Sequence, residues 1–169
     1  MYPNTRIDKI SLINFKNHLN TNLKDLGSFV VLNGNNGSGK TNILEAISLF
    51  SPGRGIKNSR FVEMPNKDSD QKNFEIKINV KYDTGEVELF RSFSSVEKNK
   101  NYISVDNEKI TNFQLLEFIN ILWITPIMEK VIIQNNSEKR NFFDRLIFNI
   151  NKSHLKNYAK LVKLLSERL

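Results

Sequence analysis

The chain has 169 residues, 39% of them hydrophobic, which is enough for one compact domain with a buried core. It contains no cysteine, and this excludes disulfides, thiolate zinc sites and cysteine nucleophiles. No apolar run approaches the roughly 20 residues of a membrane span, and the N-terminus lacks a signal-peptide core. We therefore expect a soluble, cytoplasmic protein.

The net charge of +7 is unevenly distributed along the chain. Residues 1–60 and residues 137–169 each carry 8 Lys and Arg against 3 Asp and Glu, whereas residues 61–136 carry 9 against 12. Basic ends around an acidic middle are typical of a nucleic-acid-binding surface. A general bias toward Lys, Asn and Ile would give the same composition, and charge alone does not decide between the two.

The first elements that we predict are strands. Residues 6–15 mix apolar and polar side chains as a half-buried strand does, and residues 21–26 can return as its hairpin partner after a turn at 16–18. Residues 28–32, Ser-Phe-Val-Val-Leu, predict a short buried strand.

A phosphate-binding loop follows that strand. Residues 34–41 fit the P-loop pattern G-x-x-x-x-G-K-[ST] at every required position. Glycines let successive backbone N–H groups point at phosphate oxygens, the lysine reaches the β- and γ-phosphates, and the threonine hydroxyl binds Mg²⁺. A helix predicted over residues 41–50, with Ile43, Leu44, Ile47 and Phe50 on one face, adds its positive N-terminal end. The candidate nucleotide-binding residues are Gly34, Asn35, Asn36, Gly37, Ser38, Gly39, Lys40 and Thr41, with Thr41 also the candidate Mg²⁺ ligand.

The middle of the chain predicts β-structure. Residues 51–55, Ser-Pro-Gly-Arg-Gly, end the helix, and residues 64–73 predict an exposed loop. Residues 74–82 alternate as a strand does, and residues 86–93 return antiparallel to it. A further hairpin is expected over residues 102–110.

Beyond that hairpin, Thr111 caps a predicted short helix that runs to Asn120, and residues 121–124 predict a buried strand closed by Pro126. The order of elements describes an α/β domain, with an antiparallel β layer beside a P-loop core.

Two helices are predicted at the end of the chain, over residues 137–148 and from about residue 153 onward. The second has apolar residues at coiled-coil spacing, but Leu161 and Leu164 widen the stripe, so packing against this domain or an adjacent arm remains equally open. We divide the chain into an N-terminal head lobe at 1–150 and the start of a helical arm at 151–169. Because the sequence ends inside an apolar-periodic helix, we expect the arm to be truncated.

No acidic motif for hydrolysis is found. A hydrolysing P-loop enzyme needs an apolar run followed by Asp, which holds Mg²⁺, but residues 121–124 lead to Thr125-Pro126 and residues 131–133 lead to Gln134. We therefore assign no catalytic residue and expect this chain to be inactive alone. ABC-type heads with an inserted arm place that motif far downstream, unlike small kinases and GTPases.

Several segments resemble one family. The Phe15-Lys16-Asn17 segment is similar to the F-R-N element at the start of RecF, the recombination mediator ATPase, and residues 33–50 are similar to its N-G-S-G-K-T-N-I-L-E-A-I segment. Residues 51–55 resemble its glycine-arginine turn, and residues 122–126 and 137–145 resemble its T/S-P strand end and R-R-x-F-L-D helix. The P-loop segment alone fits any SMC-like ATPase, and the last two segments favour RecF.

The resemblance implies the N-terminal part of an ABC-type ATPase head that binds ATP and Mg²⁺, forms a homodimer on ATP binding and hydrolyses ATP slowly in a DNA-dependent manner. It also implies binding to single-stranded or gapped duplex DNA, work with RecO and RecR, and a role in repair and the SOS response. Lys16 and Asn17 are possible nucleotide contacts. Lys16 and Lys139 stand where the family has Arg, and the Mg²⁺-contacting glutamine stays unassigned, because Ile127 occupies its place and Gln134 is not aligned with it.

Some alternatives stay open. Arg54, Lys57 and Arg60 form a basic turn that is a candidate for DNA phosphates or for an ordinary solvated helix stop. His18 and His154 have no metal-site spacing, and we expect both to be solvated. An SMC-type head with a coiled-coil arm and a nucleotide-gated scaffold that never hydrolyses are the alternative functions.

Overall fold

The computed structural model describes residues 5–97 and 99–126. Beyond these it describes isolated positions, namely Lys139, Arg140, Phe143, Asp144, Leu146, Ile147, Asn157, Lys160, Leu164 and Glu167. The chain divides into two compact units, Met1–Leu115 and Leu116–Leu169. The described functional features lie in the first unit.

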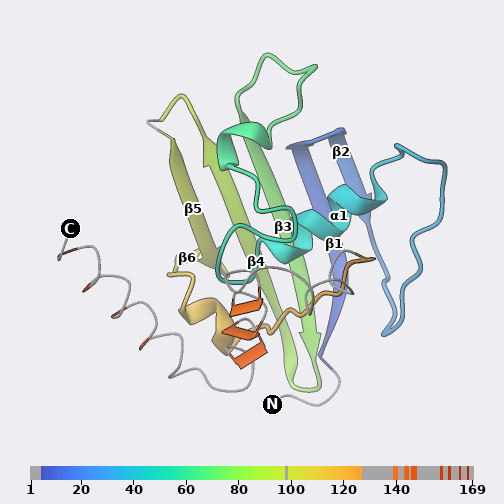
Figure 1. Ribbon diagram of the computed structural model, residues 1–169. Coiled ribbons are helices and arrows are strands. Elements are labelled where there is room, and N and C mark those ends of the chain that lie inside the picture. The colour runs from blue at the N-terminus through green and yellow to red at the C-terminus, as the bar shows by residue number, and fades with distance from the viewer. Residues whose placement is uncertain are drawn as a thin grey trace. The chain divides into compact units, whose positions relative to one another are not determined.

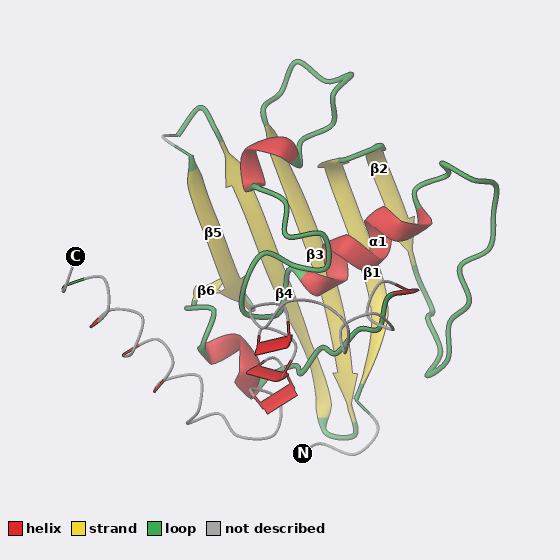
Figure 2. Ribbon diagram, in the orientation of Figure 1, coloured by secondary structure: helices red, strands yellow, loops and turns green. Residues whose placement is uncertain are grey.

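The first unit is built on one antiparallel sheet (Figures 1 and 2). Its strands follow the order β2-β1-β3-β4-β5-β6, so every neighbouring pair except β1 and β3 is joined by a hairpin. The strands are β1 (Arg6–Phe15), β2 (His18–Leu23), β3 (Asn73–Tyr82), β4 (Gly85–Ser94), β5 (Lys100–Val105) and β6 (Glu108–Lys109).

The strand predictions for this sheet are confirmed with small shifts at the ends. The turn of the β1–β2 hairpin is shorter than predicted. The sequence predicts the second strand at residues 21–26, but β2 begins at His18, which pairs with Phe15. β3 and β4 pair from Asn73 with Ser94 to Tyr82 with Gly85, in the register that their alternation predicts. The turn between β5 and β6 has Asp106 and Asn107 at φ 46° and 69°, a conformation that these residue types tolerate in tight hairpins.

Helix α1 (Lys40–Ser48) lies across one face of the sheet, over β1 (Figure 1). The predicted helix is confirmed, and Ile43 and Phe50 are buried as expected. Leu44 is instead 49% exposed, and Ala46 and Leu49 take part in the buried face. Two short 3-10 helices, η1 (Phe61–Glu63) and η2 (Gln114–Glu117), lie in the described residues up to 126, and η2 replaces the longer helix expected from Thr111 to Asn120.

Two predicted buried strands are wrong. Residues 28–32 form no strand, and Phe29 and Val31 are 87% and 72% exposed. Residues 121–124 also form no strand, and Leu122 and Ile124 are exposed. An apolar run becomes a buried strand only where neighbouring strands supply ladder hydrogen bonds and a second layer covers it. The described sheet includes neither segment among its strands.

The predicted exposed loop over residues 64–73 is only partly confirmed. Met64, Pro65 and Asn66 are buried, because this stretch runs back along the end of β1. Phe15 bridges Pro65 there, and the Lys16 amide donates to the Met64 carbonyl at 2.7 Å. The loop after α1 is thus fastened to the turn between β1 and β2.

A buried arginine lies among the aromatic residues of the sheet. Arg91 on β4 is fully buried, lies 5.6 Å from the centroid of the Phe61 ring, and donates a hydrogen bond to Asn112. Phe61 in turn stacks on Phe74 and Phe93. Burial lowers the pKa of Arg91 to about 10, and no carboxylate pairs with it in the described part of the chain. Its positive charge therefore opposes folding, while its methylene groups pack the core.

We predict that Arg91→Met raises the free energy of unfolding by about 1–3 kcal/mol, because it keeps the packing volume and removes a buried charge that no described carboxylate neutralises. Arg91→Ala should lower the free energy of unfolding, because the packing of the arginine methylene groups is lost together with the charge. Urea denaturation followed by circular dichroism measures both. Destabilisation by the methionine variant equal to that of the alanine variant would show that the charge itself stabilises the fold.

Candidate nucleotide-binding site

The loop of residues 34–41 curls around the ammonium group of its own lysine. Lys40 Nζ donates to the carbonyl oxygens of Gly34 at 2.7 Å and Asn35 at 2.8 Å. Gly34, Gly37 and Gly39 all have positive φ, which allows the loop to close this tightly. Residues 34–38 are exposed, so the ammonium group is held at an open loop, from which it can move to a phosphate oxygen.

The N-terminus of α1 is open to an anion. Gly39 is the N-cap residue, no side chain caps the helix, and its first turn holds no acidic residue. The amides of Asn42 and Ile43 donate to the Gly39 carbonyl, which leaves the earlier amides and the positive end of the helix dipole for a ligand.

Thr41 lies in this first turn and is exposed, as a Mg²⁺ ligand of a P-loop must be. Among the described residues no cluster of three or more His, Asp or Glu could hold a metal ion. A Mg²⁺ ion here would therefore depend on phosphate oxygens and the Thr41 hydroxyl, the mode that this ion prefers with nucleotides.

The β1–β2 turn holds the loop in place. His18 is 7% exposed, and its Nε2 lies 3.2 Å from the Gly39 carbonyl oxygen. Since a carbonyl only accepts, Nε2 carries the proton, and Nδ1, 2.8 Å from Thr21 Oγ1, accepts from that hydroxyl in the neutral ring. The prediction of a solvated His18 is wrong, and His154 lies outside the described residues. The sequence signal that could have revealed His18 was its place in a tight turn before the P-loop.

Gly39 is where the turn and the loop meet most closely. A Cβ atom on Gly39 would lie 2.5 Å from His18 Nε2 and 2.6 Å from Asn17 Oδ1, and the residue has φ 96°. The backbone conformation therefore favours glycine at this position, and a Cβ atom would also force the His18 and Asn17 side chains to move.

We predict that Gly39→Ala lowers the free energy of unfolding by about 1–3 kcal/mol through backbone strain and displaces the turn from the loop. Gly37→Ala is the matched control, since Gly37 also has positive φ, 82°, but no atom lies within 4 Å of its Cβ position. Thermal denaturation of both variants measures the difference. Equal melting temperatures would show that the contact with His18 and Asn17 adds nothing to the strain.

A polar network leads from the loop to a buried carboxylate. Asn17 Nδ2 donates to the Gly37 carbonyl at 3.1 Å, and Asn17 Oδ1 accepts from Asn42 Nδ2 at 2.8 Å. Lys57 Nζ donates to Asn42 Oδ1 at 2.8 Å and lies 3.0 Å from Glu45 Oε2. Glu45 is fully buried on α1. Neither Glu45 nor Asn42 is among the predicted site residues, although a glutamate between apolar helix residues is a signal for a buried charge.

Lys16 joins the same network from the turn. Its ammonium group lies 3.7 Å from Glu45 Oε1 and donates to the Glu63 carbonyl at 3.2 Å. Lys16 and Asn17 also line a cleft of about 810 Å³ beside the turn. The other lining residues are Val62, Glu63, Pro65, Asn66, Lys67, Asp68 and Lys72. Both candidate nucleotide contacts of the turn thus lie between the phosphate loop and an open cleft.

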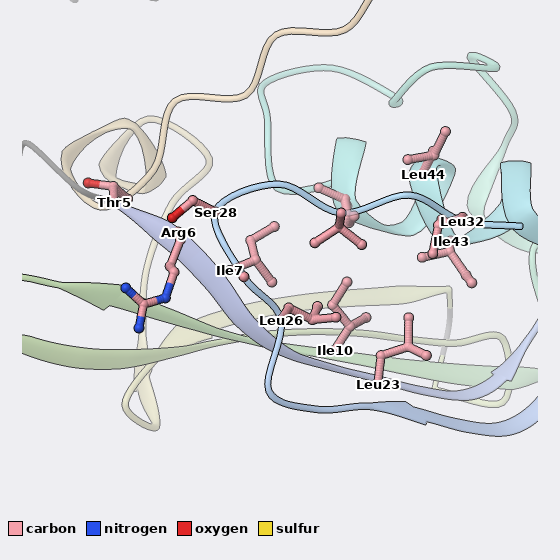
Figure 3. Close-up of a pocket in the computed structure, with 13 residues that line it drawn as sticks. Thr5, Arg6, Ile7, Ile10, Leu23, Leu26, Ser28, Leu32, Ile43 and Leu44 are labelled. Atoms are coloured by element: carbon pink, nitrogen blue, oxygen red, sulfur yellow. The ribbon is translucent and has the colours of Figure 1, made fainter.

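A second hollow, of about 320 Å³, is apolar (Figure 3). It lies between the start of β1, the end of β2 and α1, and Figure 3 shows Arg6 directed away from its centre. Its lining residues are Thr5, Arg6, Ile7, Ile10, Leu23, Leu26, Gly27, Ser28, Val30, Leu32, Ile43, Leu44 and Ile47. Its lining provides no cluster of donors that would bind phosphate.

The basic turn after α1 does not present three equivalent cations. Lys57 pairs with Glu45, and Arg60 pairs with Glu63 at 2.7 Å, a hydrogen bond that lowers the pKa of Glu63. Arg54 is exposed and has no ion pair in the described part of the chain. The DNA-binding role of all three remains a prediction, and the geometry favours Arg54.

Other predictions fall largely outside the described residues. Among them are the candidate glutamine positions 127 and 134 and the boundary at 150. The apolar residues at coiled-coil spacing in the last predicted helix, Leu155, Tyr158, Val162, Leu165 and Leu169, lie outside the described residues as well. Where residues of the last two predicted helices are described, all but Glu167 are helical. In the part of the chain that the structure covers, no helix is long and apolar enough to span a membrane.

The sheet, the loop and α1 together define a phosphate-binding P-loop domain. The AAA domain family matches residues 9–169, and the chain belongs to this family. Its curated relatives include the DNA replication and repair protein RecF of Rickettsia prowazekii (strain Madrid E), 33% identical over 165 residues, which are 98% of this chain and 45% of that protein. RecF of Rickettsia bellii (strain OSU 85-389) is 34% identical over 92% of this chain and 42% of that protein. The chain spans about half the length of these relatives.

Solved structures agree with this relationship. Two structures of the recombination mediator protein RecF, one of them RecF-ATP, superpose with TM-scores of 0.85 and 0.83 at 25% identity. They cover 97% and 99% of this chain, which covers 44% of each. A structure from work on SMC ATPases has a TM-score of 0.61 at 23% identity over 83% of this chain and 98% of its own, and it supports the fold alone. The resemblance to the N-terminal part of RecF and the predicted fold class are confirmed.

Proposed function

We propose that this chain binds ATP with Mg²⁺ and forms the nucleotide-binding part of a RecF-like ATPase that works on DNA in replication and repair. The observation that carries the proposal is the open P-loop, with Lys40 held over its carbonyls and the turn at Asn17 and His18 holding its shape. Relatives described as RecF-ATP and as DNA replication and repair proteins support it.

In this proposal each group has a physical role. The backbone amides of residues 35–41 and the N-terminus of α1 bind the β- and γ-phosphates. Lys40 exchanges its contacts with Gly34 and Asn35 for phosphate oxygens, and the Thr41 hydroxyl holds Mg²⁺. Lys16 and Asn17 approach the nucleotide from the turn. This set binds and orients ATP, and it contains no carboxylate to position the attacking water.

Hydrolysis therefore requires more than these residues. An acidic motif and a partner head are the expected additions, and hydrolysis would then be slow and coupled to ATP-gated dimerisation. DNA, RecO and RecR as partners, the SOS response and a cytoplasmic location belong to the same proposal.

Replacing Lys40 with Ala should weaken MgATP binding by the 169-residue chain at least about 10-fold, since it removes the charge-assisted contacts to phosphate. Calorimetric titration with MgATP measures the affinity, and circular dichroism checks the fold. Lys24→Ala, an exposed lysine just after β2, is the control for loss of one positive charge. Unchanged binding by a folded Lys40→Ala variant would remove the assignment.

DNA binding is expected to depend on backbone phosphates and not on base sequence. Neutralising Arg54, as Arg54→Gln, should weaken binding to gapped duplex and lower the log–log salt slope by about 0.9. Lys77→Gln is the control, because Lys77 lies on β3 in the acidic middle and pairs with Glu88. Fluorescence anisotropy at several salt concentrations measures both. Equal losses would show that the charge pattern carries no positional information.

A further inference from the structure

Glu45 is a buried charge with few partners. It is 0% exposed, and no hydrogen bond to either carboxylate oxygen is found in the described part of the chain. The ammonium groups of Lys57 and Lys16, 3.0 Å and 3.7 Å away, are its charge compensation there. A buried carboxylate strongly favours ammonium groups held in place beside it, because leaving the charge unpaired is unfavourable. Glu45 therefore fixes the end of the Lys57 side chain.

The fixed ammonium group sets the direction of the next two hydrogen bonds. An ammonium only donates, so it selects the oxygen of the Asn42 amide, and the nitrogen of Asn42 must then face Asn17. That nitrogen selects Asn17 Oδ1, which directs Asn17 Nδ2 to the Gly37 carbonyl. Every bond in the series runs in one direction, from Lys57 to the phosphate loop. If the side-chain amide of Asn42 or of Asn17 were rotated by 180°, its nitrogen would face another hydrogen-bond donor and its oxygen another acceptor.

We propose that Glu45 and Lys57 are positioning residues for the phosphate-binding loop and act on it through the Lys57–Asn42–Asn17–Gly37 series of hydrogen bonds. The proposal rests on the proposed function and deepens it, since it assigns to residues outside the motif a part in nucleotide affinity. It also gives Lys57, a candidate DNA contact, a different role. The series connects the loop that follows α1 to the phosphate loop that precedes it. A change in the position of Lys57 should therefore alter the conformation of the phosphate loop, and a change in the phosphate loop should alter the position of Lys57.

The test is a mutant cycle on MgATP affinity in the 169-residue chain. Glu45→Gln removes the buried charge at constant size, and Lys57→Met removes the ammonium group. Each should raise the Kd for MgATP by about 3–10-fold, the equivalent of one hydrogen bond in the series. The double variant should be no weaker than the weaker single variant, because both act through the same contacts. Losses that multiply, or a Kd equal to that of wild type in both single variants, would overturn the proposal.

Asn42→Ala keeps the test usable if substitution of the buried carboxylate prevents folding. It interrupts the series in the middle and leaves Glu45 paired with both lysines. The matched control is a second buried carboxylate with a lysine, Asp8 with Lys81 at 2.9 Å on the sheet. Asp8→Asn and Lys81→Met should lower the melting temperature but leave the Kd unchanged. An equal effect of the control pair on Kd would show that the Glu45 variants act only through general stability.

Side-chain amide resonances separate this proposal from nucleotide binding itself. In ¹⁵N–¹H spectra without nucleotide, Lys57→Met should shift the Nδ2 signals of Asn42 and Asn17 and the backbone signals of the phosphate loop near Gly37. If these signals did not shift in the Lys57→Met variant, the proposed series of hydrogen bonds would be ruled out even if the chain binds ATP. If wild type bound MgATP no better than Lys40→Ala while these signals moved, the proposed function would fail and the positioning of the loop would stand.

Discussion

The contact between the β1–β2 turn and Gly39 is the constraint on which the site depends. A P-loop is a stretch of backbone whose glycines give it freedom, and its binding shape requires fixation from outside. Here the fixation comes from the His18 ring and the Asn17 side-chain amide, which reach the loop at Gly39 and Gly37. Because the turn belongs to the antiparallel sheet, the sheet determines where the phosphates would lie.

The second unusual feature is the placement of charge under the loop. Glu45 lies on the buried face of α1, where an apolar residue would pack more simply. Its ion pairs bring Lys16 from the turn before the P-loop and Lys57 from the loop after α1 to one carboxylate. Three segments distant in sequence are thereby linked by electrostatics, while Arg91 and its aromatic neighbours link the η1 segment to the sheet by packing.

Local pattern predicted those parts of the fold that are locally determined. The alternation of residues 74–82 predicts a strand and the periodicity after the motif at 34–41 predicts a helix, and both elements are confirmed. Residues 28–32 are different, because an apolar run does not specify its own pairing partners. The same limit applies to the site. The motif predicted the loop, but it did not predict the contacts of His18, Asn42 and Glu45, because their partners come from other segments of the chain and only folding brings them together.

The exposed segment at residues 28–32 has a consequence for the behaviour of the chain in solution. It presents Phe29, Val30 and Val31 to water in a sequence with high β-propensity and no charge. Such segments pair readily with copies of themselves and begin aggregation. The apolar hollow beside it, lined partly by Val30 and Leu32, enlarges the exposed apolar surface. Colloidal stability of the purified chain therefore depends on its net positive charge, and salt that screens this charge would favour self-association.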